Sequence, residues 1–318
     1  MPVPTPPCPL CAEPRSFTLR QFAVDPLARE WTATFGFDPF ASLATPPSTL
    51  TLHRCVACEL EFWQPAAMGD DRFYARLSTA PWYYEDTRWE FTEALGRLAA
   101  ARSIRSVLEV GCGAGHFLDK ISGVYAATGL ETNHAGLEAC RARGHHVTDA
   151  PLAELQGPFD AVVLFEVLEH IPDPAPFLGQ LARLLAPGGV LIIAVPNPDG
   201  YWRDFDHVLL DMPPHHATRW RARSFETLAT QHGFDLVGIA YEPLRHVHFR
   251  QYVDALIAQH LGAVAPPASP RARLLHRLQR LVGFLLSPLA ALATALAYES
   301  HRRHLPGQTQ LVEFRRRA

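Results

Sequence analysis

Apolar runs and amphipathic segments alternate along the middle of the chain, from residue 106 to residue 196. The runs SVLEV, AVVLF and VLIIAVP are almost continuously apolar, as expected for strands buried on both faces. Between them, stretches such as PFLGQLARLL carry apolar side chains at helical spacing. Strands that alternate with helices in this way predict an α/β fold, with a doubly wound, mostly parallel sheet covered by helices on both faces.

Further elements flank this region. Apolar and aromatic residues recur at helical spacing from Trp89 to Leu98 and predict a lead-in helix. A helix is expected to begin near Ser224, followed by a strand at 234–240, and the C-terminal GQTQLVEFRRR is expected to pair antiparallel to that strand. We therefore divide the chain into a zinc-ribbon-like module (1–65), a helical lead-in (66–104), the main domain (105–240), a helical insertion or lid (241–305) and the final strand of the sheet (306–318).

The insertion holds a mostly apolar stretch, residues 281–298, that approaches the length of a membrane span. A single crossing is disfavoured because it would leave the final strand on the wrong side of the bilayer to complete the sheet. After residue 270 the chain has an excess of seven positive charges, since arginines far outnumber the two glutamates. Two interpretations stay open: residues 271–303 make peripheral contact with an anionic membrane, or they form a lid or a dimer surface.

Composition narrows the class of protein. The 318 residues have 48% hydrophobic content, which is typical of a globular chain, and a formal net charge of −3. The basic excess expected of a protein whose main partner is nucleic acid is missing, so DNA and RNA are disfavoured. The start MPVPTPPCPLC has no charged leader followed by an apolar core, so we expect a cytoplasmic protein, at the inner face of the membrane if the insertion binds lipid.

Four of the six cysteines form two C-x-x-C pairs near the start of the chain. In a protein that is not exported, such pairs favour metal ligation over disulfides, and four thiolates make a closed, structural zinc site. The glycine that often follows such a pair is replaced here by Ala12 and by Glu59. Reduced cysteines without a metal, or redox chemistry, are the alternatives. The expected zinc ligands are Cys8, Cys11, Cys55 and Cys58.

A glycine-rich turn follows the first strand of the main domain. It reads E-x-G-x-G-x-G, whereas a dinucleotide fingerprint would read G-x-G-x-x-G. The carboxylate of Glu109 is poorly placed for a pyrophosphate but suits an ammonium group. Glu131 lies twenty residues after Gly111, where a carboxylate can accept hydrogen bonds from ribose hydroxyls. Together these residues predict a ligand that is a nucleoside with an amino-acid tail.

The same turn, with FDAVVLFEVLEHIPDP and LLAPGGVLIIAVPNP, resembles the class I S-adenosylmethionine-dependent methyltransferases, and the branch related to ubiquinone O-methyltransferases in particular. The resemblance covers residues 103–240 and implies a seven-stranded Rossmann-like sheet. Some bacterial members also carry a four-cysteine zinc knuckle before this fold and accompany glycan or lipid-linked saccharide pathways. For the cofactor, the resemblance implies that Gly111, Gly113 and Gly115 approach the methionine part and ribose, that Glu131 binds the ribose, that Asp149 lies near the adenine, and that Phe165 and Glu166 border the cofactor.

Methyl transfer to a hydroxyl group usually needs a base. His215 and His216 follow the fifth strand, at the edge where an acceptor is expected, and a histidine near its ordinary pKa of about 6.5 can take a proton at neutral pH. We predict one of them as the base; two hydrogen-bonded loop histidines are the alternative. By resemblance to quinone-type relatives, Glu166, Glu169 and His170 are a candidate set for a divalent ion, although a role at the cofactor rim is favoured.

The sequence therefore predicts a methyltransferase that acts on a small-molecule, saccharide or lipid-linked acceptor, with transfer to oxygen favoured. An RNA methyltransferase with a zinc-binding front end is one alternative, disfavoured because the arginines cluster in the C-terminal insertion. A non-catalytic partner protein that binds S-adenosylmethionine is the other. Both acidic cofactor residues, Glu109 and Glu131, are present, which disfavours this second alternative.

Overall fold

The computed structural model describes residues 6–41, 43, 45–80, 83–205, 207–261 and 295–318. The chain forms two compact units. The larger unit contains residues 1–198, 207–240 and 309–318, and the smaller one contains residues 199–206 and 241–308. The zinc-ribbon-like module and the main domain, which the sequence separates, thus belong to one compact unit.

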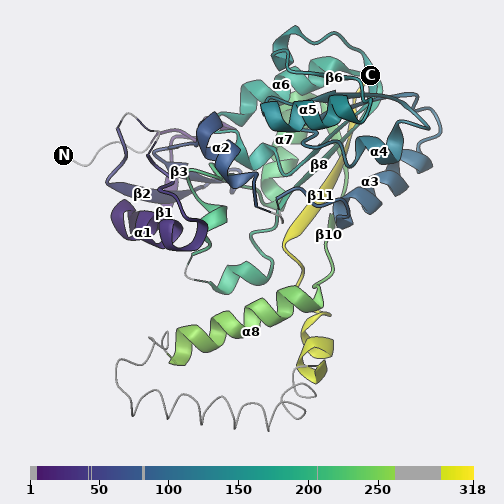
Figure 1. Ribbon diagram of the computed structural model, residues 1–318. Coiled ribbons are helices and arrows are strands. Elements are labelled where there is room, and N and C mark those ends of the chain that lie inside the picture. Colours follow the sequence, from purple (N-terminus) through teal and green to yellow (C-terminus); the bar gives the residue numbers. More distant parts are fainter. Residues whose placement is uncertain (1–5, 42, 44, 81–82, 206, 262–294) are drawn as a thin grey trace. The chain divides into compact units, whose positions relative to one another are not determined.

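A seven-stranded sheet organises the larger unit (Figure 1). Its strand order is β10-β11-β8-β7-β4-β5-β6, with neighbours hydrogen-bonded. The pairs among β8, β7, β4, β5 and β6 are parallel, and β11 runs antiparallel to β8. The predicted α/β class is confirmed. The strands are β4 (Ser106–Val110), β5 (Ala126–Leu130), β6 (Val147–Thr148), β7 (Phe159–Phe165), β8 (Leu185–Pro196), β10 (Phe234–Tyr241) and β11 (Thr309–Arg316).

Helices cover both faces of this sheet. Successive side chains of a strand point to opposite faces, so each strand packs against the helices on both sides. On β7, Val162 and Leu164 pack in one apolar cluster with α6 and α7, whereas Ala161 and Val163 pack in a second cluster with α3, α4 and α5. Near-continuous apolar strands are the sequence signature of this arrangement. The helices are α3 (Trp89–Ala100), α4 (Leu118–Ile121), α5 (His134–Ala142), α6 (Pro174–Leu184) and α7 (Ala222–His232).

A second, four-stranded sheet has the order β1-β2-β3-β9. Three strands come from the N-terminal region, and the fourth, β9 (Thr218–Arg219), comes from the segment after β8 and pairs antiparallel with β3. Cys8, Cys55 and Cys58 share the apolar cluster that contains Phe225 of α7. The N-terminal elements are β1 (Ser16–Ala23), α1 (Val24–Phe35), β2 (Thr49–Cys55), β3 (Glu61–Gln64) and α2 (Asp71–Leu77).

The smaller unit contains η3 (Tyr201–Asp204), α8 (His246–Leu261) and helical residues 295–301. Tyr201, Leu244, Phe249 and Leu305 form its apolar cluster. Within the described ranges, no helix combines the length and the apolar character that a bilayer crossing requires. Most of the apolar stretch at 281–298, and most of the proposed membrane contact at 271–303, lie outside the described residues.

Candidate functional site

The glycine turn after β4 has a backbone that favours glycine. Gly111, Gly113 and Gly115 have φ angles of 74°, 52° and 84°, in the left-handed region. A Cβ atom on Gly111 would lie 2.4 Å from Cγ2 of Val167. The N–H of Gly111 donates to the carbonyl oxygen of Leu130 at 2.8 Å, which holds the turn against the end of β5. The turn therefore presents backbone atoms without side chains at the carboxyl ends of the parallel strands, where ligands of such sheets bind.

Glu131 stands at the end of β5 and contacts this turn. One carboxylate oxygen accepts a hydrogen bond from the N–H of Gly113 at 2.7 Å, and the other accepts one from the N–H of Asn133 at 2.7 Å. The side chain is buried, and burial raises the pKa of the carboxyl group although both backbone bonds oppose that shift. Glu131 is therefore fixed by the backbone at the place where the sequence predicts a ribose.

Glu109 lies on β4, directly before the turn, and is 2% exposed. Within the described residues, its Oε2 atom has no hydrogen-bond donor. Burial, and then the negative charge of Glu131, raise the pKa of the Glu109 carboxyl group well above its usual range. A buried carboxylate with one oxygen lacking a donor fits a ligand that brings a positive charge, such as the ammonium group of an amino-acid tail. The buried carboxylates of Glu109 and Glu131 therefore suit the predicted cofactor.

The other predicted cofactor residues differ in their surroundings. Phe165 is buried against Phe91 and Phe117, with ring centroids 5.0 and 4.7 Å away, so it packs in the core below the turn. Glu166 follows it with a φ of 54°, a backbone strain that often marks a functional site. The side chain of Asp149 is 65% exposed and lies 4.0 Å from Arg141. Their contacts with a cofactor stay predictions.

Three histidines form a cluster at the same edge of the sheet. His170 ends η2 (Leu168–His170), after β7, whereas His215 and His216 follow η4 (Leu209–Asp211). The ring centroids are 4.4 Å apart for His215 and His216, 4.7 Å for His170 and His215, and 4.8 Å for His170 and His216. Burial lowers the pKa of His170 to about 4 and those of His215 and His216 well below their usual value. All three rings are therefore neutral at pH 7.

Each ring in this cluster is oriented through its Nδ1 atom. Nδ1 of His170 lies 2.6 Å from the carbonyl oxygen of His215, and Nδ1 of His215 lies 2.8 Å from the carbonyl oxygen of Leu210. Nδ1 of His216 lies 3.2 Å from a carboxylate oxygen of Asp211. Carbonyl and carboxylate oxygens accept, so each Nδ1 carries the proton and each Nε2 of a neutral ring is left with a lone pair.

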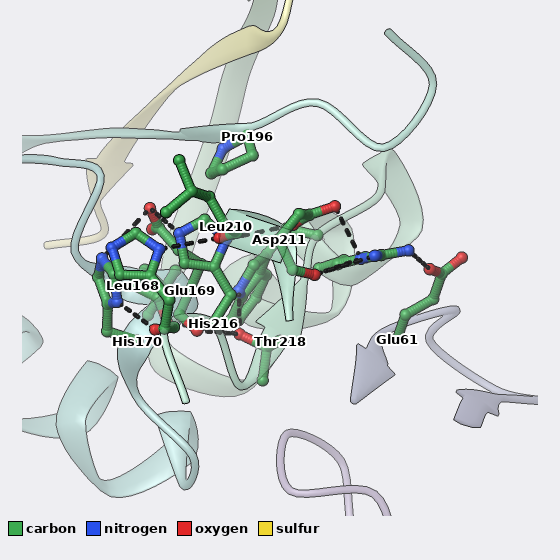
Figure 2. A network of polar contacts seen from close by, with 12 residues as sticks. Glu61, Leu168, Glu169, His170, Pro196, Leu210, Asp211, His216 and Thr218 are labelled. Carbon is green, nitrogen blue, oxygen red and sulfur yellow. Dashed lines mark hydrogen bonds and ion pairs between the residues drawn. The ribbon is translucent and has the colours of Figure 1, made fainter. Parts of the chain in front are cut away.

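A chain of ion pairs connects the cluster to the N-terminal module. Figure 2 shows Glu169 and Asp211 beside His216, and Glu61 of β3 at the far end of the network. Arg219 on β9 lies 2.9 Å from a carboxylate oxygen of Asp211 and 3.8 Å from one of Glu61. Because β9 pairs with β3, the module that carries the cysteines also holds the segment that carries the histidines. Sequence reasoning missed Asp211, Arg219 and Glu61, since no local spacing connects them.

Two tyrosines lie between the glycine turn and the histidine cluster. A Cβ atom on Gly113 would lie 2.7 Å from the ring of Tyr84, so this ring covers the turn. Tyr83 packs edge-on against Tyr84 at 4.9 Å, and its ring centroid is 6.5 Å from that of His215. The turn and the cluster therefore flank one aromatic pair. The hydroxyl of Tyr74 on α2, which the sequence did not single out, lies 3.2 Å from Nδ1 of His170.

The four N-terminal cysteines lie together, although about forty residues separate the two pairs. Their sulfur atoms all lie within 4.8 Å of one another, with Sγ–Sγ distances of 3.5 Å for Cys8 and Cys58 and for Cys11 and Cys55. Tetrahedral zinc with Zn–S bonds of about 2.3 Å needs sulfurs about 3.8 Å apart, so the group fits the ion. The N–H of Ala57 lies 3.4 Å from the sulfur of Cys55, as expected where the backbone supports a thiolate.

Comparison with known proteins assigns the central region. A family model described as a methyltransferase domain matches residues 83–239. A Mycolicibacterium smegmatis protein named "Probable S-adenosylmethionine-dependent methyltransferase" is 38% identical over 127 residues, which cover 37% of this chain and 49% of that protein. The ubiquinone biosynthesis O-methyltransferase of Psychrobacter arcticus is 28% identical over 189 residues, which cover 51% of this chain and 74% of that protein. The chain thus spans about half the length of the first relative.

Among solved structures, phosphoethanolamine N-methyltransferase 2 of Haemonchus contortus, in complex with S-adenosyl-L-methionine, has a TM-score of 0.49 at 15% identity. The alignment covers 78% of this chain and 58% of that chain. The sheet order, the glycine turn with its two buried glutamates, the match at residues 83–239 and the two relatives agree with one another. Residues 83–239 therefore form a domain of the class I S-adenosylmethionine-dependent methyltransferase type.

Proposed function

We propose that this protein transfers the methyl group of S-adenosylmethionine to a hydroxyl oxygen of a small-molecule, saccharide or lipid-linked acceptor. The observation that carries the proposal is that the glycine turn and a cluster of unprotonated imidazoles flank the same aromatic pair, Tyr83 and Tyr84. The name of the Psychrobacter arcticus relative supports transfer to oxygen.

On the cofactor side, Glu109 would hold the ammonium group and Glu131 the ribose. When bound, S-adenosylmethionine supplies a methyl group on a positively charged sulfur. The backbone of the glycine turn sets the position of the cofactor, because Val167 and Tyr84 leave no room for side chains on Gly111 and Gly113. Displacement at carbon depends mainly on alignment, and fixed backbone supplies alignment without ordering cost at the time of reaction.

On the acceptor side, the hydroxyl group must lose its proton as the new oxygen–carbon bond forms. The imidazoles of His170, His215 and His216 are the groups that assist this loss, because each has a lone pair on Nε2. The sequence assigns the proton directly to His215 or His216, and the neutral state of both rings is what a general base requires. A protonated His216 would also have the carboxylate of Glu169 3.8 Å from its Nε2 atom.

The first test is calorimetric titration of the full chain with S-adenosylmethionine and, separately, with NAD. We expect saturable binding of S-adenosylmethionine alone. The second test supplies S-adenosylmethionine with a ¹³C-labelled methyl group to phenols, sugars and lipid-linked saccharides, and follows the methyl carbon by NMR. A labelled methyl group on oxygen supports the proposal, whereas labelling of nitrogen or carbon only would contradict it.

Single substitutions test whether methyl transfer depends on the histidine cluster. His216→Ala should slow turnover at least tenfold and leave the affinity for S-adenosylmethionine unchanged. His207→Ala is the matched control, because His207 lies in the same connection but pairs with Glu30, 2.8 Å away, outside the cluster. Equal turnover of the two variants would remove the histidines from the reaction. Binding of the cofactor without transfer to any acceptor would favour the non-catalytic alternative.

A further inference from the structure

The histidine cluster has a feature that a general base does not need. One ring nitrogen from each of His170, His215 and His216 lies within 4.8 Å of the chosen nitrogens of the other two. Proton transfer uses one imidazole, whereas three convergent imidazoles in a buried site are the ligand set of a transition-metal ion. Because each Nδ1 is engaged by an oxygen acceptor, the lone pairs that remain are all on Nε2.

Glu169 supplies a fourth group, and its surroundings point to a cation. Its Oε1 atom is 3.8 Å from Nε2 of His170 and 3.8 Å from Nε2 of His216. Its side chain is 1% exposed, and neither carboxylate oxygen has a hydrogen-bond donor among the described residues. Nε2 of His215 is also buried and without a partner in that part of the chain. Lone pairs of the carboxylate therefore face lone pairs of imidazoles, which is unfavourable unless a proton or a cation lies between them.

The outer contacts of the histidines match those of metal ligands. A metal-binding histidine typically donates its second ring N–H to a carbonyl or carboxylate oxygen, which fixes the tautomer and the ring orientation. His170 and His215 donate to carbonyl oxygens, and His216 donates to Asp211, whose carboxylate Arg219 holds at 2.9 Å. This pattern is complete for all three rings.

We propose that His170, His215, His216 and Glu169 bind a divalent transition-metal ion of the zinc class. Tetrahedral zinc with ligands at about 2.0–2.1 Å needs ligand atoms about 3.3 Å apart. The observed separations are 3.8 Å from Oε1 of Glu169 to Nε2 of His170 and of His216, and at most 4.8 Å among the three ring nitrogens, so the ligands must move closer together to bind the ion. Three imidazoles favour zinc, cobalt or iron over magnesium, which prefers oxygen ligands. The set shares Glu169 and His170 with the candidate set of Glu166, Glu169 and His170, but it differs in chemistry, because its other two ligands are the imidazoles of His215 and His216 from the segment after η4.

The role of the ion rests on the proposed function. If it is bound there, a zinc-class ion held by these residues would lower the pKa of an acceptor hydroxyl group and so favour loss of its proton. With the ion bound, the histidines would assist the loss of the acceptor proton through the ion, and this replaces the direct transfer to His215 or His216 that the sequence predicts. The metal site itself is tested without any acceptor, so that failure of the methyl-transfer proposal leaves this test intact.

The experiment uses the chain of residues 1–318 with one equivalent of zinc in the cysteine site. Cobalt(II) is added, and binding is followed by visible absorption and calorimetry. We expect one further equivalent to bind with ligand-field bands and without the near-ultraviolet thiolate band that would report entry into the cysteine site. His215→Gln and His216→Gln should weaken this binding by about 100-fold or more, and Asp211→Ala, which removes the oxygen that accepts from Nδ1 of His216, by about 10–100-fold. His207→Gln is the matched control and should change nothing.

Three outcomes would overturn the proposal. Wild-type protein could bind no further cobalt, which would mean that Glu169 and the histidines share a proton instead. Cobalt binding could survive His215→Gln and His216→Gln. Magnesium could bind in a way that Glu166→Gln abolishes and His215→Gln does not, which would favour the carboxylate-rich set. Titration of each variant with S-adenosylmethionine shows whether the main domain is still folded, and the stoichiometry of the wild-type protein decides the question even if a glutamine variant does not fold.

Discussion

The carboxylate of Glu131 accepts a hydrogen bond from the backbone N–H of Gly113 at 2.7 Å, which joins the end of β5 to the turn that follows β4. Eighteen residues separate the two partners. The bond fixes the carboxylate before any ligand arrives. Such a preorganised acceptor binds ribose hydroxyls with less loss of side-chain freedom than a mobile one.

Substitution of Glu131 should therefore weaken cofactor binding. Glu131→Ala removes charge-assisted hydrogen bonds worth about 1–3 kcal/mol, so the Kd for S-adenosylmethionine should rise about 5- to 150-fold in calorimetry. Glu138→Ala is the matched control, because Glu138 lies on the next helix with its side chain 55% exposed and pairs only with Arg141 among the described residues. Unchanged affinity in the Glu131 variant would refute its role at the ribose.

Glu109 should make cofactor binding depend on pH. Its carboxyl group has a raised pKa in the free protein, and it must be ionised to pair with an ammonium group. As pH falls through that raised pKa, the affinity for S-adenosylmethionine should fall, by at most about tenfold per pH unit. Glu109→Gln should bind at least about tenfold more weakly and should lack this dependence.

The same substitution should stabilise the free protein. A raised carboxyl pKa means that the free energy of unfolding falls as pH rises above the unfolded-state pKa of Glu109, so the penalty of ionising the buried side chain is absent below that pKa and is complete above the folded-state pKa. Glu109→Gln removes the penalty, so its melting temperature without ligand should exceed that of the wild type at pH 8. A lower melting temperature at that pH would show that the ionised side chain has a stabilising partner.

Gly111 should tolerate no side chain. Gly111→Ala places a Cβ 2.4 Å from Val167 at a φ of 74°, so we expect the affinity for S-adenosylmethionine to fall more than about tenfold as the turn shifts. Gly144→Ala is the control that separates the cost of backbone strain from the effect of a clash in the glycine turn. Gly144 has a similar φ of 80°, but an added Cβ would meet no atom within 4 Å. That control should cost about 1–2 kcal/mol of stability and leave the affinity unchanged.

The two cysteine knuckles should gain stability from glycine. Ala12 and Glu59 each have a φ of 60°, the conformation in which such knuckles often place glycine. Glu59→Gly should raise the free energy of unfolding by about 1 kcal/mol in denaturant titrations with zinc present. The exposed Ala57, which lies in the same knuckle without a positive φ, is the control, and Ala57→Gly should instead lower stability by about 0.5–1 kcal/mol. The same sign for both variants would contradict the argument.

The four cysteines should hold one zinc ion, and that ion should matter for folding. Cys8→Ser should lose one equivalent by mass spectrometry and lower the melting temperature sharply, because structural zinc has an apparent binding free energy of about 10–16 kcal/mol in small domains. The loss of stability should extend to the part of the chain that follows His215 and His216, since Ser224 on α7 donates to the carbonyl oxygen of Cys58 at 2.9 Å. Wild-type stability in a variant without zinc would show that the apolar cluster alone holds the module.

The sequence by itself determined the parts of this protein that depend on local patterns. Apolar periodicity predicted the parallel strands and their helices, the glycine spacing predicted a ligand-binding turn after the first strand of the main domain, and the cysteine spacing predicted that the two C-x-x-C pairs come together. In each case the residues that form the pattern lie within a few positions of one another. The first strand, β1, was not predicted: only the short run SFTLR alternates polar and apolar residues, and its apolar side chains, Phe17 and Leu19, are exposed in the fold.

Only the tertiary structure decided which of these parts meet. His170 lies 45 residues before His215, whose carbonyl oxygen its ring contacts, and Glu61 lies 160 residues before Arg221, with which it pairs. These contacts form because the chain after β8 returns to the N-terminal sheet, where β9 pairs with β3. The spacing of residues along the sequence does not reveal such a long-range pairing. The residue types of the site are thus visible in the sequence, whereas the gathering of three imidazoles, two of them beside the carboxylate of Glu169, is a property of the fold.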